Sequence, residues 1–529
     1  MDKDLNTSHL ESPHLESPQL AKDGANNATN SELQMGLVEA IRLYPMAVVW
    51  SVGLSTAVIM EGYSVMLLSS FYALPEFNRK YGQLLQDGTH VIPAPWKSGL
   101  SNGALCGEIL GLFLTGLFQD RFGYRMTILA ALCLVTGFIF ILFFARNVEM
   151  LLVGEILCGI PWGAFQTITV AYASEVCPVA LRAYLTTYVN LCWVIGQFVV
   201  SGVLKAMLVR QDQWAYRIPF AVQWVWPIPL IVMCLLAPES PWWLVRHGRM
   251  EDARTSLVRL MSRSDHSNLA ADETLAMIQH TNQLEKEASA DTSYRECFKL
   301  SNLRRTEIVC LTWLIQVICG SQLMGYSTVF YIAAGLPESA SFNMSLIQYA
   351  IGAIGTILSW FLMVHTGRRT LYLYGLLALF FLLMIIGCVS LGPHSTITNR
   401  AIGALLSIFT FTYDLTVGPV CYSLVSELSS TRLRAKSVVL ARSLYNVGGI
   451  VVNILINYQL TRTAWNWGAR SAFFWAGVCF CCVVWVFFRL PEPRGRSYAE
   501  LDVLFANKVS ARKFASTRVD IFRSTVVTE

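Results

Sequence analysis

The segment YASEVCPVALRAY (residues 172–184) recurs in altered form late in the chain as LVSELSSTRLRAK (residues 424–436). Each copy stands between two long apolar runs, so its polar residues lie where one run ends and the next begins. In each copy a glutamate precedes an arginine by seven positions, namely Glu175 and Arg182 in the first copy and Glu427 and Arg434 in the second. The recurrence predicts two related halves, each with a charge pair at the same membrane face.

A second pair of segments repeats in the same order. GLFQDRFGYR (residues 116–125) in the first half corresponds to SWFLMVHTGRR (residues 359–369) in the second half. Anchoring of helix ends in lipid headgroups would explain one such charged segment, but not charged segments at matching places in both halves. Internal repeats of this kind place a binding site between the repeats, near the middle of the bilayer. The architecture therefore predicts a transporter.

The composition agrees with a chain that is solvated mainly by lipid. Apolar residues make up 54% and charged residues only 14%, whereas a soluble domain has roughly 25% charged residues. The net charge of +5 is too small and too scattered for a nucleic-acid partner. Most of the 14 cysteines lie in apolar runs and predict neither disulfides nor a zinc site. No catalytic constellation recurs, so we expect neither an enzyme nor a cofactor.

Twelve apolar stretches are long enough to cross a bilayer core of ~30 Å. They predict an all-α membrane protein with two six-helix bundles. The expected division is a disordered cytosolic tail (1–45), the first bundle (46–237), a cytosolic linker of surface helices (238–305), the second bundle (306–488) and a cytosolic tail (489–529).

The orientation follows from lysine and arginine, which concentrate in cytosolic loops. The loops after spans 2, 8 and 10, the middle segment and the C-terminal tail are basic, and all lie on one side if both termini are cytosolic. Arg79, Lys80, Lys205 and Arg210 lie on the other side and make the bias imperfect.

The two repeated segments, together with PESPW (238–242) and PEPRG (491–495), resemble the signatures of the sugar porter branch of the major facilitator superfamily over about residues 45–505. Within that branch, ILCGIPWGAFQT and TVGPVCYSLVSELSSTRLRAKSVVLAR are similar to the fungal maltose-permease group. The resemblance implies α-glucoside:proton symport across the plasma membrane by alternating access. We expect the chain to act as a monomer, with a sugar and a proton as its partners.

The resemblance also implies a network of charges that ties the halves together at the cytosolic face when the site faces outward. Its expected members are Asp120, Arg121, Arg125, Glu175, Arg182, Glu239, Arg368, Glu427 and Arg434. The segment 359–369 in the second half departs from the family pattern, since Val364 stands where an aspartate is usual and His365 follows it.

The sugar contacts of hexose porters map onto mostly shorter side chains in this chain. Asn190 matches a glutamine of span 5, Ser321 and Gln322 match the paired glutamines of span 7, Ser327 matches an asparagine, Tyr422 matches the aromatic residue of span 10, and Asn446 matches a tryptophan of span 11. Tyr326 and Tyr422 would offer aromatic faces to a sugar ring. The shortened wall favours a disaccharide.

Four acids interrupt the spans, namely Glu61, Glu108, Glu155 and Asp414. An ionised carboxylate in the membrane costs at least ~2.5–3.5 kcal/mol, so each is a candidate functional group. In proton-coupled sugar porters the position of Ser64 is normally the proton-carrying aspartate. Coupling must therefore pass to Glu61, Glu108 or Glu155, with Arg442 as the expected counter-charge, or be absent. Symport, facilitated uniport and a non-transporting sugar sensor remain as alternatives.

Overall fold

The structure, a computed structural model, describes residues 35–86, 88–262, 267–289, 294–393, 395–429, 433–494, 496, 498–514, 517–520 and 525–527. Most of the N-terminal tail predicted to be disordered (1–45) lies outside these residues. Within the described part the prediction is wrong for α2 (Leu37–Leu43), which is helical. The helix is held by the linker, because the amide of Ser262 donates to the carbonyl of Leu43 at 2.8 Å.

In the part of the chain that the structure describes, ten helical segments are long and apolar enough to cross a membrane. They comprise α3 (Pro45–Ser55) with α4 (Ala57–Phe71), α6 (Ala94–Phe143), α7 (Val148–Val176), α8 (Val179–Met207), α9 (Trp214–Val222) with η1 (Gln223–Val225) and α10 (Pro227–Leu236), α17 (Glu338–His365), α18 (Arg368–Val389), α19 (Thr396–Leu415) with α20 (Val417–Leu428), α21 (Arg434–Leu460), and α22 (Ser471–Arg489) after η4 (Gly468–Arg470).

Two local features account for the difference between these ten segments and the twelve predicted spans. The helix α6 is two membrane helices joined at Gly123, whose φ of 85° is not helical. The seventh span is broken into α14 (Leu300–Ile318), α15 (Gln322–Gly325) and α16 (Ser327–Ala333). Gly320 has a φ of 97° at the first break. Interrupted spans of this kind are typical of transporter binding sites.

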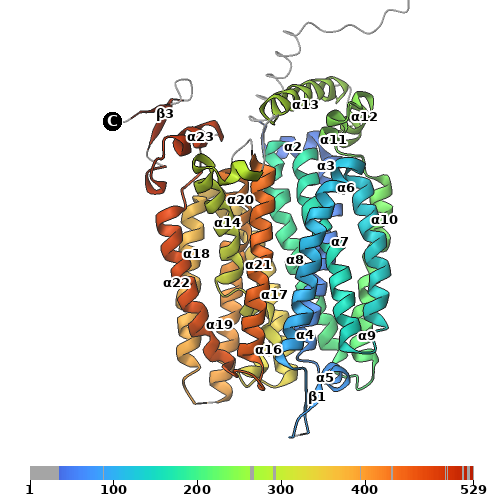
Figure 1. Ribbon diagram of the computed structural model, residues 1–529, viewed down its shortest axis with the longest axis vertical. Coiled ribbons are helices and arrows are strands. Elements are labelled where there is room, and N and C mark those ends of the chain that lie inside the picture. Colours follow the sequence, from blue (N-terminus) through green and yellow to red (C-terminus); the bar gives the residue numbers. More distant parts are fainter. Residues whose placement is uncertain are drawn as a thin grey trace, which may run out of the picture.

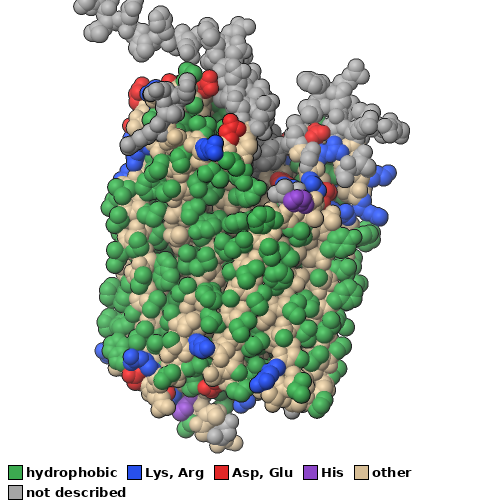
Figure 2. Space-filling model, turned by 180° about the vertical axis from the view of Figure 1, so that it is seen from behind, with side chains coloured by type: hydrophobic (Ala, Val, Ile, Leu, Met, Phe, Trp, Pro, Cys, Tyr) green, Lys and Arg blue, Asp and Glu red, His purple; other side chains and the backbone are tan. Residues whose placement is uncertain are grey.

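The two halves stand side by side, with α3–α10 in one bundle and α14–α22 in the other (Figure 1). The linker helices α11 (Pro241–Arg246), α12 (Met250–Leu260) and α13 (Ser267–Ser289), with η2 (Tyr294–Phe298), lie at one end of the bundles. Apolar side chains cover the middle of the molecule in Figure 2, and charged side chains gather at its two ends. This is the surface expected of a protein that spans a bilayer.

The opposite end carries α5 (Pro75–Tyr81) and the antiparallel strands β1 (Gln83–Leu84) and β2 (His90–Val91), which were not predicted. The C-terminal tail is folded as well, into α23 (Tyr498–Ala506), η5 (Ala511–Lys513), β3 (Arg518–Asp520) and β4 (Thr525–Val527). It is attached to α14, because Arg305 forms an ion pair with Asp502 and the Nη1 of Arg304 donates to the carbonyl of Val509 at 2.7 Å.

Candidate functional site

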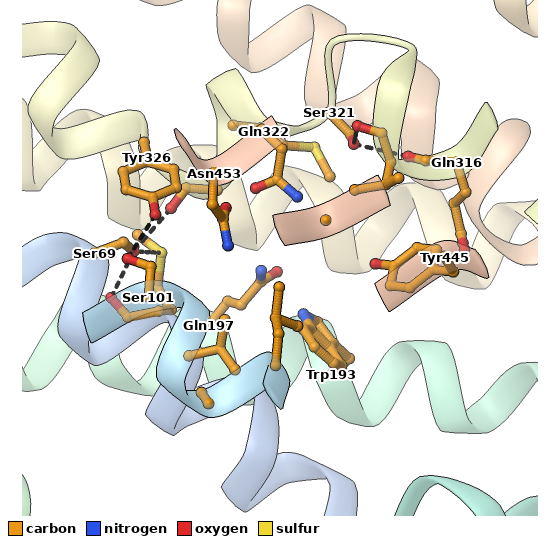
Figure 3. Close-up of a pocket in the computed structure, with 18 of the residues that line it drawn as sticks. Ser69, Ser101, Trp193, Gln197, Gln316, Ser321, Gln322, Tyr326, Tyr445 and Asn453 are labelled. Atoms are coloured by element: carbon orange, nitrogen blue, oxygen red, sulfur yellow. Dashed lines mark hydrogen bonds between the residues drawn. The ribbon is translucent and has the colours of Figure 1, made fainter. Parts of the chain in front are cut away.

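A cavity of about 140 Å³ lies between the two halves, which is room for about ten water molecules. Figure 3 shows polar and aromatic side chains that surround it from both bundles. The first bundle contributes Ser69, Ser101, Trp193 and Gln197, and the second contributes Gln316, Ser321, Gln322, Tyr326, Tyr445 and Asn453. Such a lining suits a ligand with many hydroxyl groups and apolar ring faces.

Five of the seven predicted sugar contacts line this cavity: Asn190, Ser321, Gln322, Tyr326 and Tyr422. The broken seventh span brings three of them to it, because the chain turns at Gly320 and again at Tyr326. The Nδ2 of Asn190 has no hydrogen-bond partner within the described chain, so this donor is free for a ligand.

The other two predicted contacts, Ser327 and Asn446, do not line the cavity. Ser327 is fully buried, with its Oγ 3.0 Å from the Oγ of Ser345 on α17. Asn446 is fully buried too, and neither polar atom of its side chain has a partner within the described residues. The periodicity of an apolar helix did not reveal which of its polar residues face inward to a neighbour and which face the cavity.

Sequence reasoning missed several lining residues that follow a readable pattern. On α8, Asn190, Trp193 and Gln197 recur at steps of three and four and line the cavity together. On α21, Arg442 begins a second such series, which continues with Tyr445, Gly449 and Asn453. Polar residues at helical spacing within apolar spans were the signal that could have found both faces.

The four acids that interrupt the spans divide into two groups in the structure. Glu61 and Glu108 are buried within electrostatic reach of each other and of Arg442. Glu108 and Arg442 line the cavity, whereas Glu61 lies behind it and accepts a hydrogen bond from the Nε2 of Gln166. The guanidinium of Arg442 stacks over the ring of Tyr445, 4.4 Å from its centroid.

Glu155 and Asp414 also line the cavity, but neither forms an ion pair within the described residues. Glu155 lies on α7 in the first bundle, close enough to Tyr72 for the two groups to interact electrostatically. Asp414 lies on α19 in the second bundle. These two carboxyl groups are therefore set apart from the Glu61–Glu108–Arg442 cluster.

Ser64 faces away from the cavity. Its buried hydroxyl lies 2.9 Å from the carbonyl of Met60 and 3.0 Å from the Oε1 of Gln223, and it has one proton to donate between these acceptors. The hydroxyl is thus satisfied by structural partners. Nothing in its surroundings gives it a role in proton transfer.

Two of the charges predicted to tie the halves together, Glu175 and Glu427, bind partners on their own side of the molecule. Glu175 binds Arg246 and Ser240 of the linker, and Glu427 binds the Nε of Arg368 at 3.2 Å. Asp120 and Arg121 are exposed. The side chains of Arg182, Arg434 and Val364 lie outside the described residues.

Glu239 has a different place from the one predicted, since it caps a helix. Its Oε1 accepts from the amide of Tyr124 at 3.0 Å and its Oε2 from the amide of Arg125 at 3.1 Å, at the start of the helix that follows Gly123. Glu492 does the same in the second half, where its Oε1 accepts from the amide of Arg368 at 2.9 Å. Glu239 of PESPW and Glu492 of PEPRG thus cap corresponding helices in the two repeats.

Replacement of Glu239 tests the cap. Burial raises the pKa of the Glu239 carboxyl above its usual value, although hydrogen bonds from the amides of Ser240, Arg125 and Tyr124 oppose this. Glu239→Gln keeps an oxygen that can accept from the amide of Tyr124, so its free energy of unfolding should fall by about 1 kcal/mol. Glu239→Ala loses every hydrogen bond of the cap, so its free energy of unfolding should fall by about 2–3 kcal/mol.

The pH dependence has a definite sign. Because the pKa of Glu239 is higher in the folded state than in the unfolded state, protonation of this carboxyl group stabilises the fold. The difference in free energy of unfolding between the wild type and Glu239→Gln should therefore shrink as pH rises through the folded-state pKa. Thermal unfolding of the purified variants between pH 5 and pH 8 measures this. Equal stability of the alanine variant and the wild type at every pH would rule out the cap.

The two halves hydrogen-bond to each other at the end of the cavity that faces α5 and β1. The hydroxyl of Tyr326 donates to the Oγ of Ser101 at 2.8 Å, and the Oγ of Ser69 donates to the carbonyl of Gly325 at 2.9 Å. Lys97 is buried at the same interface, with its Nζ 3.4 Å from the Oγ1 of Thr461. These contacts close the cavity toward that end.

Comparison with known proteins gives relatives over most of the chain. A family model described as "Sugar (and other) transporter" matches residues 50–505. A maltose permease of Saccharomyces cerevisiae is 45% identical over 510 residues, which cover 95% of this chain and 82% of the permease. A general alpha-glucoside permease of Saccharomyces cerevisiae is 44% identical over 508 residues, with the same coverage of 95% and 82%.

Solved structures with a similar fold include the xylose transporter XylE from E. coli in a partially occluded inward open conformation. It aligns with a TM-score of 0.69 and 17% identity over 86% of this chain and 99% of its own. The proton:xylose symporter XylE, a major facilitator superfamily protein bound to 6-bromo-6-deoxy-D-glucose, aligns with a TM-score of 0.71 and 19% identity over 87% of this chain and 99% of its own. At these identities the likeness concerns the fold alone.

Proposed function

This chain belongs to the sugar transporter family and has the major facilitator fold, and on that basis we propose that it carries an α-glucoside with a proton across the plasma membrane by alternating access. One observation supports this more than any other. The cavity between the repeats combines five of the predicted sugar contacts with buried carboxyl groups and a buried arginine. A solute and a proton can therefore meet in one place.

The proposed substrate is a glucoside larger than one ring. Asn190 and Ser321 occupy cavity positions where hexose porters have longer side chains, and both lie in the lining of this chain. The relatives named as maltose and alpha-glucoside permeases point to the same substrate class.

In the proposed orientation, the end that carries α12 and α13 is cytosolic and the end that carries β1 is outside. The hydrogen bonds between Tyr326 and Ser101 and between Ser69 and Gly325 then form the closed outer gate. At the cytosolic end, Glu175 and Glu427 bind Arg246 and Arg368 on their own sides of the molecule.

Uptake of labelled sugars tests the substrate class. In cells that lack sugar transporters, we expect the chain to take up maltose or another α-linked disaccharide at least tenfold faster than the vector control and faster than glucose. The assay compares radiolabelled maltose, trehalose, sucrose and glucose at equal concentrations. Rapid glucose uptake together with no uptake of any disaccharide would contradict the proposal.

Facilitated uniport is the second candidate, and one observation favours it. Ser64 occupies the position of the usual proton-carrying aspartate, and its hydroxyl is engaged with Met60 and Gln223. Net proton entry with sugar decides between the two modes, because only a symporter makes an unbuffered medium alkaline when sugar is added.

A further inference from the structure

Asp414 is a cavity-lining carboxyl group to which the predicted coupling scheme gives no role. It lies in the last turn of α19, two residues before Thr416, where the span breaks with φ −125° and ψ −80°. Its side chain belongs to the cavity wall, and only 3% of the residue is exposed. The Oδ2 atom packs directly over Gly352 of α17, leaving no room there for a Cβ.

The described residues around Asp414 give its carboxyl group no hydrogen bond. No hydrogen bond or ion pair to its carboxyl group occurs within the described residues, and the titratable groups beside it are the phenols of Tyr349 on α17 and Tyr413 on its own helix. Glu108, Glu155 and Arg442 line the same cavity from other helices. Arg442 is engaged electrostatically with the glutamates Glu61 and Glu108.

Several polar groups that line the same cavity donate to backbone carbonyls and not to Asp414. The Nε2 of Gln316 donates to the carbonyl of Gly418 at 3.0 Å, and the hydroxyls of Ser321 and Tyr413 donate to the carbonyl of Gln316 at 2.7 and 3.2 Å. Asp414 is thus a strong acceptor to which no donor of the described residues is directed. A buried carboxylate without donors is costly, and the negative end of the helix dipole adds to that cost.

A sugar removes this imbalance. Its hydroxyl groups are donors, and two vicinal hydroxyls can donate to the two oxygens of one carboxylate in charge-assisted hydrogen bonds. Resting on the proposed sugar transport, we propose that Asp414 accepts hydrogen bonds from hydroxyl groups of the bound glucoside. It is then the anionic sugar ligand of the second bundle, with Gly352 as the residue that leaves space for its carboxylate.

Binding to the purified protein tests this directly, with the labelled sugar that gives the fastest uptake as probe. Asp414→Asn should weaken binding at least tenfold, because charge-assisted hydrogen bonds are replaced by weaker neutral ones. Gly352→Ala should weaken binding too, since its Cβ displaces Oδ2. Asp212→Asn, at an exposed loop acid outside the cavity, is the matched control and should bind as the wild type does.

Monodeoxy analogues of the same sugar identify the contact. The analogue that lacks the hydroxyl bound by Asp414 should lose at least tenfold in affinity for the wild type, and this loss should largely vanish in Asp414→Asn. Equal losses for every analogue in both proteins would overturn the proposal. So would normal binding by Asp414→Asn with loss of proton coupling alone, since Asp414 would then be a proton site.

The outcomes separate this inference from the proposed function. If the wild type binds none of the sugars, the proposed sugar transport fails. If it binds one and Asp414→Asn binds it equally well, only the role of Asp414 fails. If Asp414→Asn does not reach the membrane, Asp414→Glu replaces it, and unchanged affinity for the sugar and for every deoxy analogue would overturn the proposal.

Discussion

Glu61→Gln should abolish uphill accumulation of sugar, so that the ratio of internal to external sugar falls to about 1, while exchange of sugar down its gradient persists. The glutamine is a neutral isostere of the protonated acid, and it keeps an oxygen that can accept from Gln166. Arg442 retains Glu108 as a counter-charge. The variant is therefore expected to behave as a carrier in which residue 61 is permanently protonated.

Three measurements on cells in unbuffered medium check this: sugar accumulation with and without a protonophore, alkalinisation after sugar addition, and exchange of labelled for unlabelled sugar. Glu149→Gln, which changes an exposed glutamate outside the cavity, is the matched control. If Glu61→Gln accumulates sugar as the wild type does, coupling belongs to Glu108 or Glu155. If the wild type itself moves no protons, the chain is a uniporter.

Ser64→Asp extends the same experiment. An aspartate at this position would meet the Oε1 of Gln223, which now accepts from the serine hydroxyl, so the amide must turn to present its Nε2. With that rotation a carboxyl group is placed about one helical turn from Glu61. We expect a steeper pH dependence of uptake than in the wild type, and an unchanged pH profile would exclude a coupling role for this position.

Gly123→Ala should be the most destabilising of the small substitutions considered. Gly123 has a φ of 85°, and a Cβ there would overlap the carboxylate of Glu239. With φ 85° and ψ 173° the backbone of Gly123 lies in a region that is essentially confined to glycine, and this costs an alanine about 1–3 kcal/mol. Displacement of the Glu239 cap adds a loss of the order of 1–3 kcal/mol. We expect the free energy of unfolding to fall by about 2–6 kcal/mol in total, with poor recovery of folded protein.

Two glycines in equivalent or nearby positions serve as comparisons. Gly367, the counterpart of Gly123 in the second half, has a φ of −67°, so Gly367→Ala meets the carboxylate of Glu492 without the backbone strain and should lose less. Gly137, on the same helix α6, has no atom within 4 Å of an added Cβ, and Gly137→Ala should be neutral or slightly stabilising. Thermal unfolding in one detergent ranks the three, and a loss for Gly137→Ala equal to that for Gly123→Ala would contradict the argument.

The sequence alone determined the architecture, because the signals for it are local. Runs of apolar residues are forced to become spans, since lipid cannot satisfy an exposed backbone. The repeats at 172–184 and 424–436 then fixed two halves. The breaks in the seventh span were not predicted, since Gly320 interrupts an apolar run without lowering its hydropathy enough to end it.

The partners of polar groups were decided only by the tertiary structure, because they come from segments far apart in the chain. Sequence spacing suggested that Glu175 meets Arg182, whose side chain lies outside the described residues. It gave no sign of Arg246 of the linker, which the fold brings to Glu175. Glu239 was expected in a charge network and instead caps the helix after Gly123. The amide of Tyr124, which donates to Glu239, lies 115 residues from it in the sequence. Likewise, helical periodicity cannot say which polar side chain turns to the cavity, as with Asn190, and which to a neighbouring helix, as with Ser327.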